Sequence, residues 1–263
     1  MVTFKYGLCL RYKLTMPEKR VLFMNVQEML KDYQPINYDN WDESGKGLNI
    51  LHLLSPLEDK IWSAALPFQD KRDDQGHAEN VTYFALKLLH YFPTPNRNIV
   101  VPAAILHDTG WSQMTEVELK LFYIPNWKDY EAPLRANHQK KGVEVADKIL
   151  TQIGYPQEFR QQILDIISEH DSRAGFLSVE DGIARDADKL WRYTLPHLYL
   201  TMKKRESSPE ELRKRLYGDY FSKPGFFHSD ISKGIGRIEF DHSMQVLQSN
   251  PKIIGKILEA VRK

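Results

Sequence analysis

Histidines that share an apolar helix face are the residues of this chain best suited to chemistry. Three expected helices each carry one on the same stripe as their apolar residues, namely His77, His138 and His170. A single buried histidine is usually hydrogen-bonded within a core, because both ring nitrogens need partners. The doublet His107-Asp108 ends the most apolar helix, where a carboxylate is costly unless it is paired or bound to a cation. A bound metal ion explains all of these placements at once.

The spacing of these residues also favours a shared metal site. His77 and His107 are separated by one expected helix and one connection. His138 and His170 follow at similar intervals, and Asp188 comes one helix later. Such intervals allow successive helices of a bundle to direct ligands toward one centre. The chain has one cysteine, so imidazole and carboxylate must hold the ion. We expect a divalent transition metal, one or two ions of Mn, Fe, Co, Ni or Zn, with Mg possible.

The composition is that of an ordinary globular protein. The 263 residues are 42% hydrophobic and 27% charged, with a formal net charge of +1. This near-neutral charge gives no reason to expect a nucleic-acid partner. No stretch approaches the ~20 apolar residues of a membrane helix, and charged residues interrupt the N-terminus before a secretory signal can form. We expect a cytoplasmic protein without a membrane partner, and homo-oligomer formation stays open.

Helical periodicity and helix-boundary signals recur along most of the chain, and strand signals are scarce. Ser55-Pro56-Leu57-Glu58 combines a capping box with a proline at the first helical position. Gly154 and Pro156 separate two further helices. We therefore predict an all-α fold. The expected helices cover about residues 56–66, 76–92, 100–108, 116–123, 138–153, 156–170, 181–204 with a kink at Pro196, the residues after Pro209, and 253–261, with a loop over Pro125, Asn126 and Pro133.

Three regions differ in character. Residues 1–54 are polar and rich in turn signals, and we interpret them as an irregular N-terminal arm. Residues 55–205 contain the histidines and form the expected metal-binding helical domain. Residues 206–263 are expected to be a helical C-terminal extension packed on the same domain.

The order H…HD…H…H…D resembles the HD-domain superfamily of metal-dependent phosphohydrolases. The doublet alone is a weak signal, but the doublet at the end of an apolar helix, an upstream histidine and Ala187-Asp188-Lys189-Leu190 downstream are strong together. The resemblance covers roughly residues 55–205 and implies an HD-like helical bundle. It also implies that one metal ion is held by His77, His107, Asp108 and Asp188. Family members with the two middle histidines often hold a second ion bridged by the doublet aspartate, which assigns His138 and His170 to that ion.

Two features limit what the resemblance implies. Asp186 and Asp188 flank the apolar stripe of their helix nearly symmetrically, each about 100° from its centre, so periodicity does not choose between them and only the family pattern favours Asp188. The commonest family doublet is followed by Gly-Lys, whereas this chain has Gly110-Trp111. A lysine that would help to bind a phosphate is therefore missing there.

Two ions that share a carboxylate lower the pKa of a bridging water and clamp a phosphoryl group. We predict an enzyme that hydrolyses a phosphate ester, with a nucleotide or a small phosphorylated metabolite as substrate. Candidate catalytic residues are Asp108, Glu79 beside His77, and Lys141, which lies about 60° around its helix from His138. One alternative is a di-iron oxygenase of a small polyol or phosphonate on the same scaffold. The other is a non-catalytic binding protein with a structural metal, although such a site usually needs only four ligands.

Overall fold

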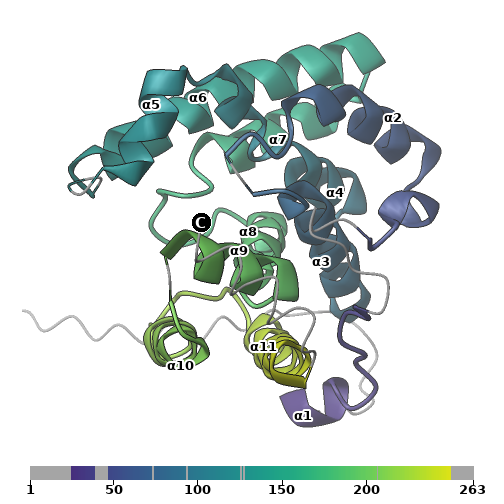
Figure 1. Cartoon of the computed structure of the whole chain (residues 1–263). Coiled ribbons are helices and arrows are strands. Elements are labelled where there is room, and N and C mark those ends of the chain that lie inside the picture. The colour runs from purple at the N-terminus through teal and green to yellow at the C-terminus, as the bar shows by residue number, and fades with distance from the viewer. Residues whose placement is uncertain are drawn as a thin grey trace, which may run out of the picture.

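The computed structural model describes residues 25–38, 47–72, 74–92, 94–124, 126, 128–205 and 207–249. Within these residues every regular element is a helix, which confirms the predicted all-α class (Figure 1). The α-helices are α1 Val26–Met29, α2 Pro56–Ala65, α3 His77–Tyr91, α4 Arg97–Leu106, α5 Glu116–Lys120, α6 Lys128–Ile153, α7 Gln157–Ser168, α8 Val179–Trp191, α9 Leu195–Arg205, α10 Pro209–Arg213 and α11 Asp230–Ser249. A short 3-10 helix, η3, spans Thr109–Gln113 between α4 and α5.

The helices surround α4. In Figure 1, α5, α6 and α7 lie along the top, α3, α4, α8 and α9 occupy the middle, and α10, α11 and α1 lie at the bottom. Helix α4 packs against α2, α3, α7 and α8, and α6 packs against α7 and η3. All side chains of α4 from Ile99 to Leu106 are buried. A helix that is apolar all round belongs inside a protein, and this burial places the doublet that follows α4 in the interior.

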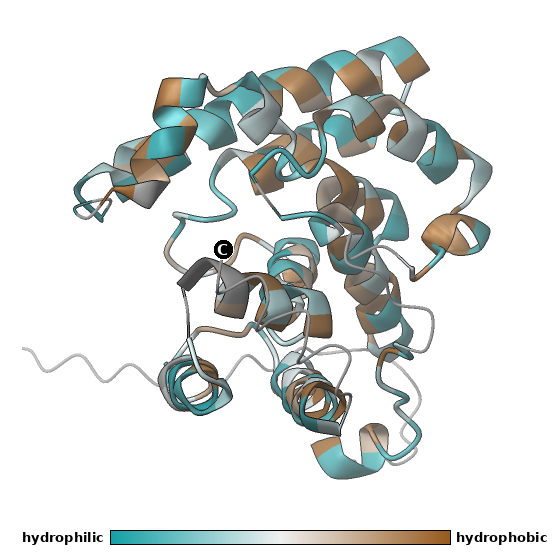
Figure 2. Ribbon diagram, in the orientation of Figure 1, coloured by the Kyte–Doolittle hydropathy of each residue, from teal (hydrophilic) through white to brown (hydrophobic). Residues whose placement is uncertain are grey.

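Side-chain polarity explains how the other helices pack. Apolar and polar residues alternate around most helices, as the brown and teal segments of Figure 2 show. The apolar faces form two large clusters. Residues of α3, α8 and α11 contribute to the first, and residues of α2, α4, α6 and α7 contribute to the second. The predicted capping box at the start of α2 is present, since Ser55 accepts a hydrogen bond from the backbone N–H of Glu58 and Glu58 accepts one from that of Ser55.

Part of the expected N-terminal arm packs into the core. Leu30, Tyr33 and Ile36 are buried in the cluster that contains α8 and α11. The Tyr33 hydroxyl donates a 2.5 Å hydrogen bond to the buried carboxyl group of Glu239 on α11, and the Ile36 backbone N–H also bonds to it. The predicted division at residues 54 and 205 stays a prediction. Residues 1–24 of the arm and the predicted helix 253–261 lie outside the described residues.

Two helices that contain a proline begin earlier than predicted. Helix α6 begins at Lys128, not near residue 138, so Pro133 lies inside a helix where we expected a loop. Helix α4 begins at Arg97 after the Asn96 cap, so Pro102 lies in its interior. Proline leaves the carbonyl four residues earlier without its helical donor. For Pro102 that carbonyl belongs to Asn98, and the Tyr155 hydroxyl donates a 2.6 Å hydrogen bond to it.

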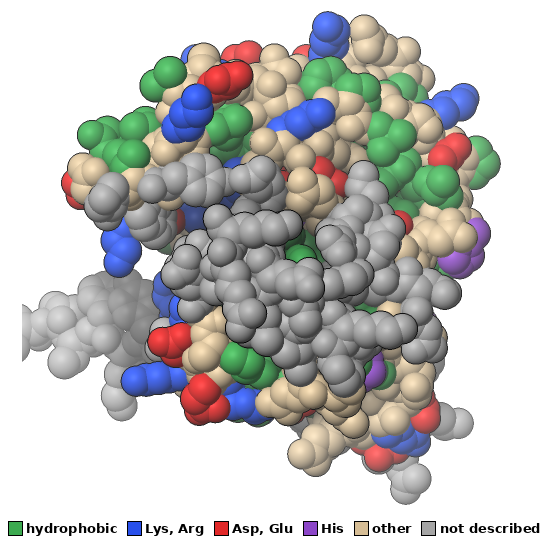
Figure 3. All heavy atoms as spheres, in the orientation of Figure 1, with side chains coloured by type: hydrophobic (Ala, Val, Ile, Leu, Met, Phe, Trp, Pro, Cys, Tyr) green, Lys and Arg blue, Asp and Glu red, His purple; other side chains and the backbone are tan. Residues whose placement is uncertain are grey.

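Two further boundaries differ from the prediction. Helix α7 ends at Ser168, so His170 lies in the turn beyond it. The expected helix 181–204 is two helices, because α8 ends at Trp191 and α9 begins at Leu195. None of the helices among the described residues is long and apolar enough to cross a membrane. Acidic and basic side chains are interspersed on the face shown in Figure 3.

Candidate metal centre

Five helices or their ends bring the six predicted metal ligands together. His77 is the first residue of α3 and follows Gly76, whose φ of 81° lies in the left-handed region that favours glycine. The doublet His107-Asp108 follows α4 directly. The three remaining residues are His138 within α6, His170 just beyond α7, and Asp188 on α8.

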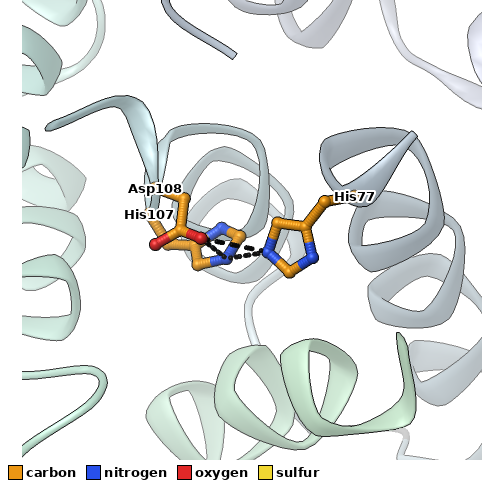
Figure 4. Close-up of side chains that lie close together, drawn as sticks. All are labelled: His77, His107 and Asp108. Carbon is orange, nitrogen blue, oxygen red and sulfur yellow. Dashed lines mark hydrogen bonds and ion pairs between the residues drawn. The ribbon is translucent and has the colours of Figure 1, made fainter. Parts of the chain in front are cut away.

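The first group of ligand atoms surrounds one side of Asp108. Its Oδ2 lies 3.2 Å from His77 Nε2 and 3.7 Å from His107 Nε2, and the two nitrogens are 3.0 Å apart (Figure 4). Asp188 Oδ1 lies 3.5 Å from the His77 nitrogen and 3.8 Å from the His107 nitrogen. Ligand atoms about 2.1 Å from one ion are roughly 3.0 to 4.2 Å apart. His77, His107 and Asp108 therefore fit one metal ion, and Asp188 lies at ligand spacing from both histidines.

The second group surrounds the other oxygen of the same carboxylate. Asp108 Oδ1 lies 3.2 Å from His170 Nε2 and 3.5 Å from His138 Nε2, and these two nitrogens are 3.4 Å apart. Asp108 therefore presents one oxygen to each pair of histidines. This is the arrangement that a carboxylate bridging two ions requires.

Backbone carbonyl groups fix which ring nitrogen faces the centre in two of the histidines. The Nδ1–H of His107 donates a 2.9 Å hydrogen bond to the Ala104 carbonyl, and that of His170 donates one of equal length to the Ile167 carbonyl. A carbonyl only accepts, so Nδ1 carries the hydrogen and the neutral ring keeps its lone pair on Nε2. Such outer hydrogen bonds orient metal-binding histidines.

The centre attracts positive charge. Burial alone lowers the pKa of His77 and of His170, but the neighbouring carboxylates, Asp108 foremost, together outweigh burial and raise both to about 9. Burial lowers the pKa of His107 and of His138. Burial raises the pKa of Asp108, but the surrounding histidines hold it well below the usual range. Without metal the centre therefore binds protons, and a cation that fits the same nitrogens and oxygens replaces them.

The structure distinguishes Asp188 from Asp186. Asp186 points away from the histidines and accepts hydrogen bonds of 2.8 and 3.2 Å from the backbone N–H groups of His228 and Ser229. The Lys189 ammonium lies 3.6 Å from the same carboxylate. Asp186 thus holds the segment before α11, and Asp188 is the carboxylate of α8 that faces the centre.

Two predicted catalytic residues are bonded elsewhere. The Glu79 carboxylate accepts 3.1 Å hydrogen bonds from the backbone N–H groups of Gly47 and Asn49. The Lys141 ammonium donates a 2.8 Å hydrogen bond to the Gln113 carbonyl and lies 3.6 Å from Glu118. Among the described residues, neither side chain is hydrogen-bonded or ion-paired with the six ligands, and their catalytic roles stay predictions.

Trp111 contacts the centre. Its indole N–H donates a 3.1 Å hydrogen bond to Asp108 Oδ1, and its ring stacks on His138 with 3.9 Å between centroids. The Arg72 guanidinium lies 4.6 Å from the centroid of the Trp111 ring. A pocket lined partly by residues 69–71 and Asp74 reaches His77 and Asp108, and its 10 Å³ of free space suffices for about one water or ion.

Gly110 sets the distance between the doublet and α6. A Cβ at this position would lie 1.9 Å from the carbonyl oxygen of His138 and 2.4 Å from the backbone nitrogen of Gly142. Only glycine allows two backbones to approach this closely. The contact brings η3 against α6 and places His138 beside Asp108.

Sequence reasoning missed two residues of the centre, Asp171 and Arg135. Asp171 Oδ2 lies 3.6 Å from His138 Nε2 and 3.9 Å from His170 Nε2. Arg135 pairs with Asp171, and Arg192 Nη1 lies 3.5 Å from Asp188 Oδ2. The position of Asp171 directly after His170 was an available signal. Arg135 fell in a segment that we expected to be a loop, so no helical spacing linked it to His138.

One family model matches part of the chain. The family model described as HD domain matches residues 75–192. This range begins just before His77 and ends just after Asp188, so it contains all six predicted ligands. Comparisons with curated proteins and with solved structures found no match.

Proposed function

Because residues 75–192 form an HD domain with a cluster of histidine and aspartate side chains, we propose that this chain is a metal-dependent phosphohydrolase. The observation that carries the proposal is the position of Asp108, with each carboxylate oxygen facing one pair of histidines. Such a centre has the donor types and spacing to hold two divalent ions that share a carboxylate.

The chain's own residues would hold and orient the reacting groups. A bound pair of divalent ions supplies an activated water and stabilises the charge of a phosphoryl group. His77, His107 and Asp188 would hold one ion, and His138 and His170 the other. Asp108 stays ionised at neutral pH, because its surrounding histidines lower its pKa, and can therefore serve both ions.

Arginine side chains near the centre support a phosphorylated substrate. Guanidinium groups bind phosphate oxygens through paired hydrogen bonds. Arg135 and Arg192 pair with the carboxylates of Asp171 and Asp188. Arg72 also pairs with a carboxylate, that of Asp74 at 3.5 Å, and its guanidinium lies over the ring of Trp111. We propose that Arg72 binds the substrate phosphate. It would take the role of the lysine that most family members have at the position of Trp111.

Phosphate release from a panel of monoesters, diesters and nucleotides tests this proposal. The full chain is assayed with Mn²⁺, Co²⁺, Ni²⁺, Zn²⁺, Fe²⁺ or Mg²⁺ against His107→Ala, which removes a ligand, and against His90→Ala, which changes an exposed histidine on α3. We expect activity in the wild type and in His90→Ala but not in His107→Ala. Equal phosphate release from all three proteins would refute the proposal. Oxygen consumption by the iron-loaded chain without phosphate release would favour the oxygenase alternative.

A further inference from the structure

The two halves of the metal centre share the same plan. On one side, Asp188 Oδ1 lies 3.5 and 3.8 Å from the Nε2 atoms of His77 and His107. On the other, Asp171 Oδ2 lies 3.6 and 3.9 Å from the Nε2 atoms of His138 and His170. Each of these carboxylates is mostly buried, with 16% of the Asp188 and 13% of the Asp171 side chain exposed.

An arginine accompanies each of these two carboxylates. Arg192 lies 3.5 Å from Asp188, four residues after it, and directly follows the last residue of α8. Arg135 lies 2.5 Å from Asp171 and one turn before His138 on α6. Each half of the centre thus has a pair of histidines, a carboxylate and an arginine. Asp171 occupies the same position relative to His138 and His170 as Asp188 does relative to His77 and His107.

We propose that Asp171 is a terminal ligand of the ion at His138 and His170, and that Arg135 positions its carboxylate. A carboxylate oxygen has two lone pairs, so Oδ2 can accept from Arg135 and bind an ion at the same time. The inference concerns metal binding alone, and it holds whether the loaded centre hydrolyses a phosphate ester or does other chemistry.

The surroundings of Asp171 hold it in place for this role. Its backbone N–H donates a 3.0 Å hydrogen bond to Gln139 Oε1, and the Ser172 hydroxyl donates one of 3.2 Å to the same oxygen. Gln139 is 1% exposed and directly follows His138 on α6. The turn that carries Asp171 is thus bonded to the same stretch of helix that carries His138 and Arg135.

The charges around Arg135 also leave room for a cation. Arg135 pairs with Glu131 at 2.9 Å as well as with Asp171. One guanidinium facing two carboxylates leaves these three side chains with one negative charge in excess, and Asp171 is the member of the group that lies beside His138 and His170. A divalent ion between these histidines compensates that charge. Without Asp171, the ion at His138 and His170 would have the bridging Asp108 as its only carboxylate ligand. The ion at His77 and His107 would have both Asp108 and Asp188.

Metal titration of Asp171→Asn tests the assignment directly. The metal-stripped full chain is titrated with Mn²⁺, and calorimetry gives the number of sites and their affinities. We expect two ions in the wild type. In Asp171→Asn we expect one ion with unchanged affinity and a second bound at least about 100-fold more weakly, because loss of an outer hydrogen-bond partner already costs 10–100-fold. Electron paramagnetic resonance should show loss of the coupled Mn²⁺ pair.

A distant carboxylate and the supporting arginine provide the comparisons. Asp147→Asn removes an α6 carboxylate that pairs with Arg160, and it should bind two ions as the wild type does. Arg135→Gln keeps Asp171 and should weaken only the second ion, by roughly 10–100-fold. It also tests the inference if Asp171→Asn does not fold, as judged by circular dichroism.

Three results would overturn the inference. These are two ions of wild-type affinity in folded Asp171→Asn, equal weakening of both ions in that variant, or a wild-type chain that binds a single ion. Absence of phosphate release from any substrate would refute the proposed hydrolase function but would leave these metal affinities to decide the role of Asp171.

Discussion

Replacement of Gly110 by alanine tests whether the contact between η3 and α6 builds the centre. The new Cβ would lie 1.9 Å from the His138 carbonyl oxygen and 2.4 Å from the Gly142 nitrogen. Ordinary contact needs about 3.4 Å, so the two segments must separate by roughly 1.5 Å. Both obstacles are backbone, which cannot rotate away as a side chain can. We therefore expect a loss of about 3 kcal/mol in the free energy of unfolding, at the upper end for overpacking.

Two measurements report the effect of Gly110→Ala. A loss of this size lowers Tm by roughly 6–12 °C in a domain of this length, which differential scanning calorimetry resolves. The same separation moves His138 away from Asp108. In the wild type, His138 Nε2 lies 3.5 Å from Asp108 Oδ1. We expect the ion at His138 and His170 to bind more weakly, while the ion at His77 is less affected.

A matched variant separates this effect from the general effect of alanine. A Cβ at Gly218 would meet no atom within 4 Å, so Gly218→Ala should keep the wild-type Tm and both ions. If Gly110→Ala also kept the wild-type Tm and bound two ions, the close approach would not be what positions His138, and the reasoning would be refuted.

Three further predictions follow from single residues. Asp188→Asn should weaken the ion at His77 and His107 by at least about 100-fold, whereas Asp186→Asn should keep both ions, and metal-to-protein ratios after desalting check this. Arg72→Ala should raise KM for a phosphorylated substrate about tenfold or more with little change in kcat, because a charge-assisted hydrogen bond is worth about 1.5–3 kcal/mol; an unchanged KM would contradict its role. Burial raises the pKa of Glu239 from 4.5 to about 7, so the folded protein keeps a proton that the unfolded chain loses. The free energy of unfolding should therefore fall by about 3 kcal/mol as the pH rises through this range and then level off, and urea titrations of Glu239→Gln should lack this slope.

Features that depend on nearby residues could be predicted from the sequence. The capping box at Ser55 and the break at Gly154 depend on contacts within a few residues, and the structure has both. The all-α class follows from the helical period of the apolar residues. The burial of His77 and His138 could be predicted because each lies on the apolar stripe of its helix, which faces the interior. The predicted loop over Pro133 was wrong, since a proline removes only one helical hydrogen bond and the tertiary packing of α6 outweighs that loss.

Features that depend on how helices are placed could not be predicted in this way. Asp186 and Asp188 are equivalent by helical period, and the rotation of α8 against α3 and α4 turns Asp188 toward the histidines and Asp186 toward residues 228 and 229. Glu79 lies two residues after His77 but faces the segment at residues 47–49, since helical residues two apart point about 200° apart, on nearly opposite sides of the helix.

The sequence by itself determined which residue types could hold a metal and that helices would carry them. The period of the apolar residues predicts the helices, and a carboxylate at the end of an apolar helix is costly to bury without a cation. Only the tertiary structure decided that Asp108 lies between two pairs of histidines and that Asp171 and Arg135 join the second pair. Those positions depend on the packing of η3 and α7 against α6, and atoms brought together across helices leave no period in the sequence.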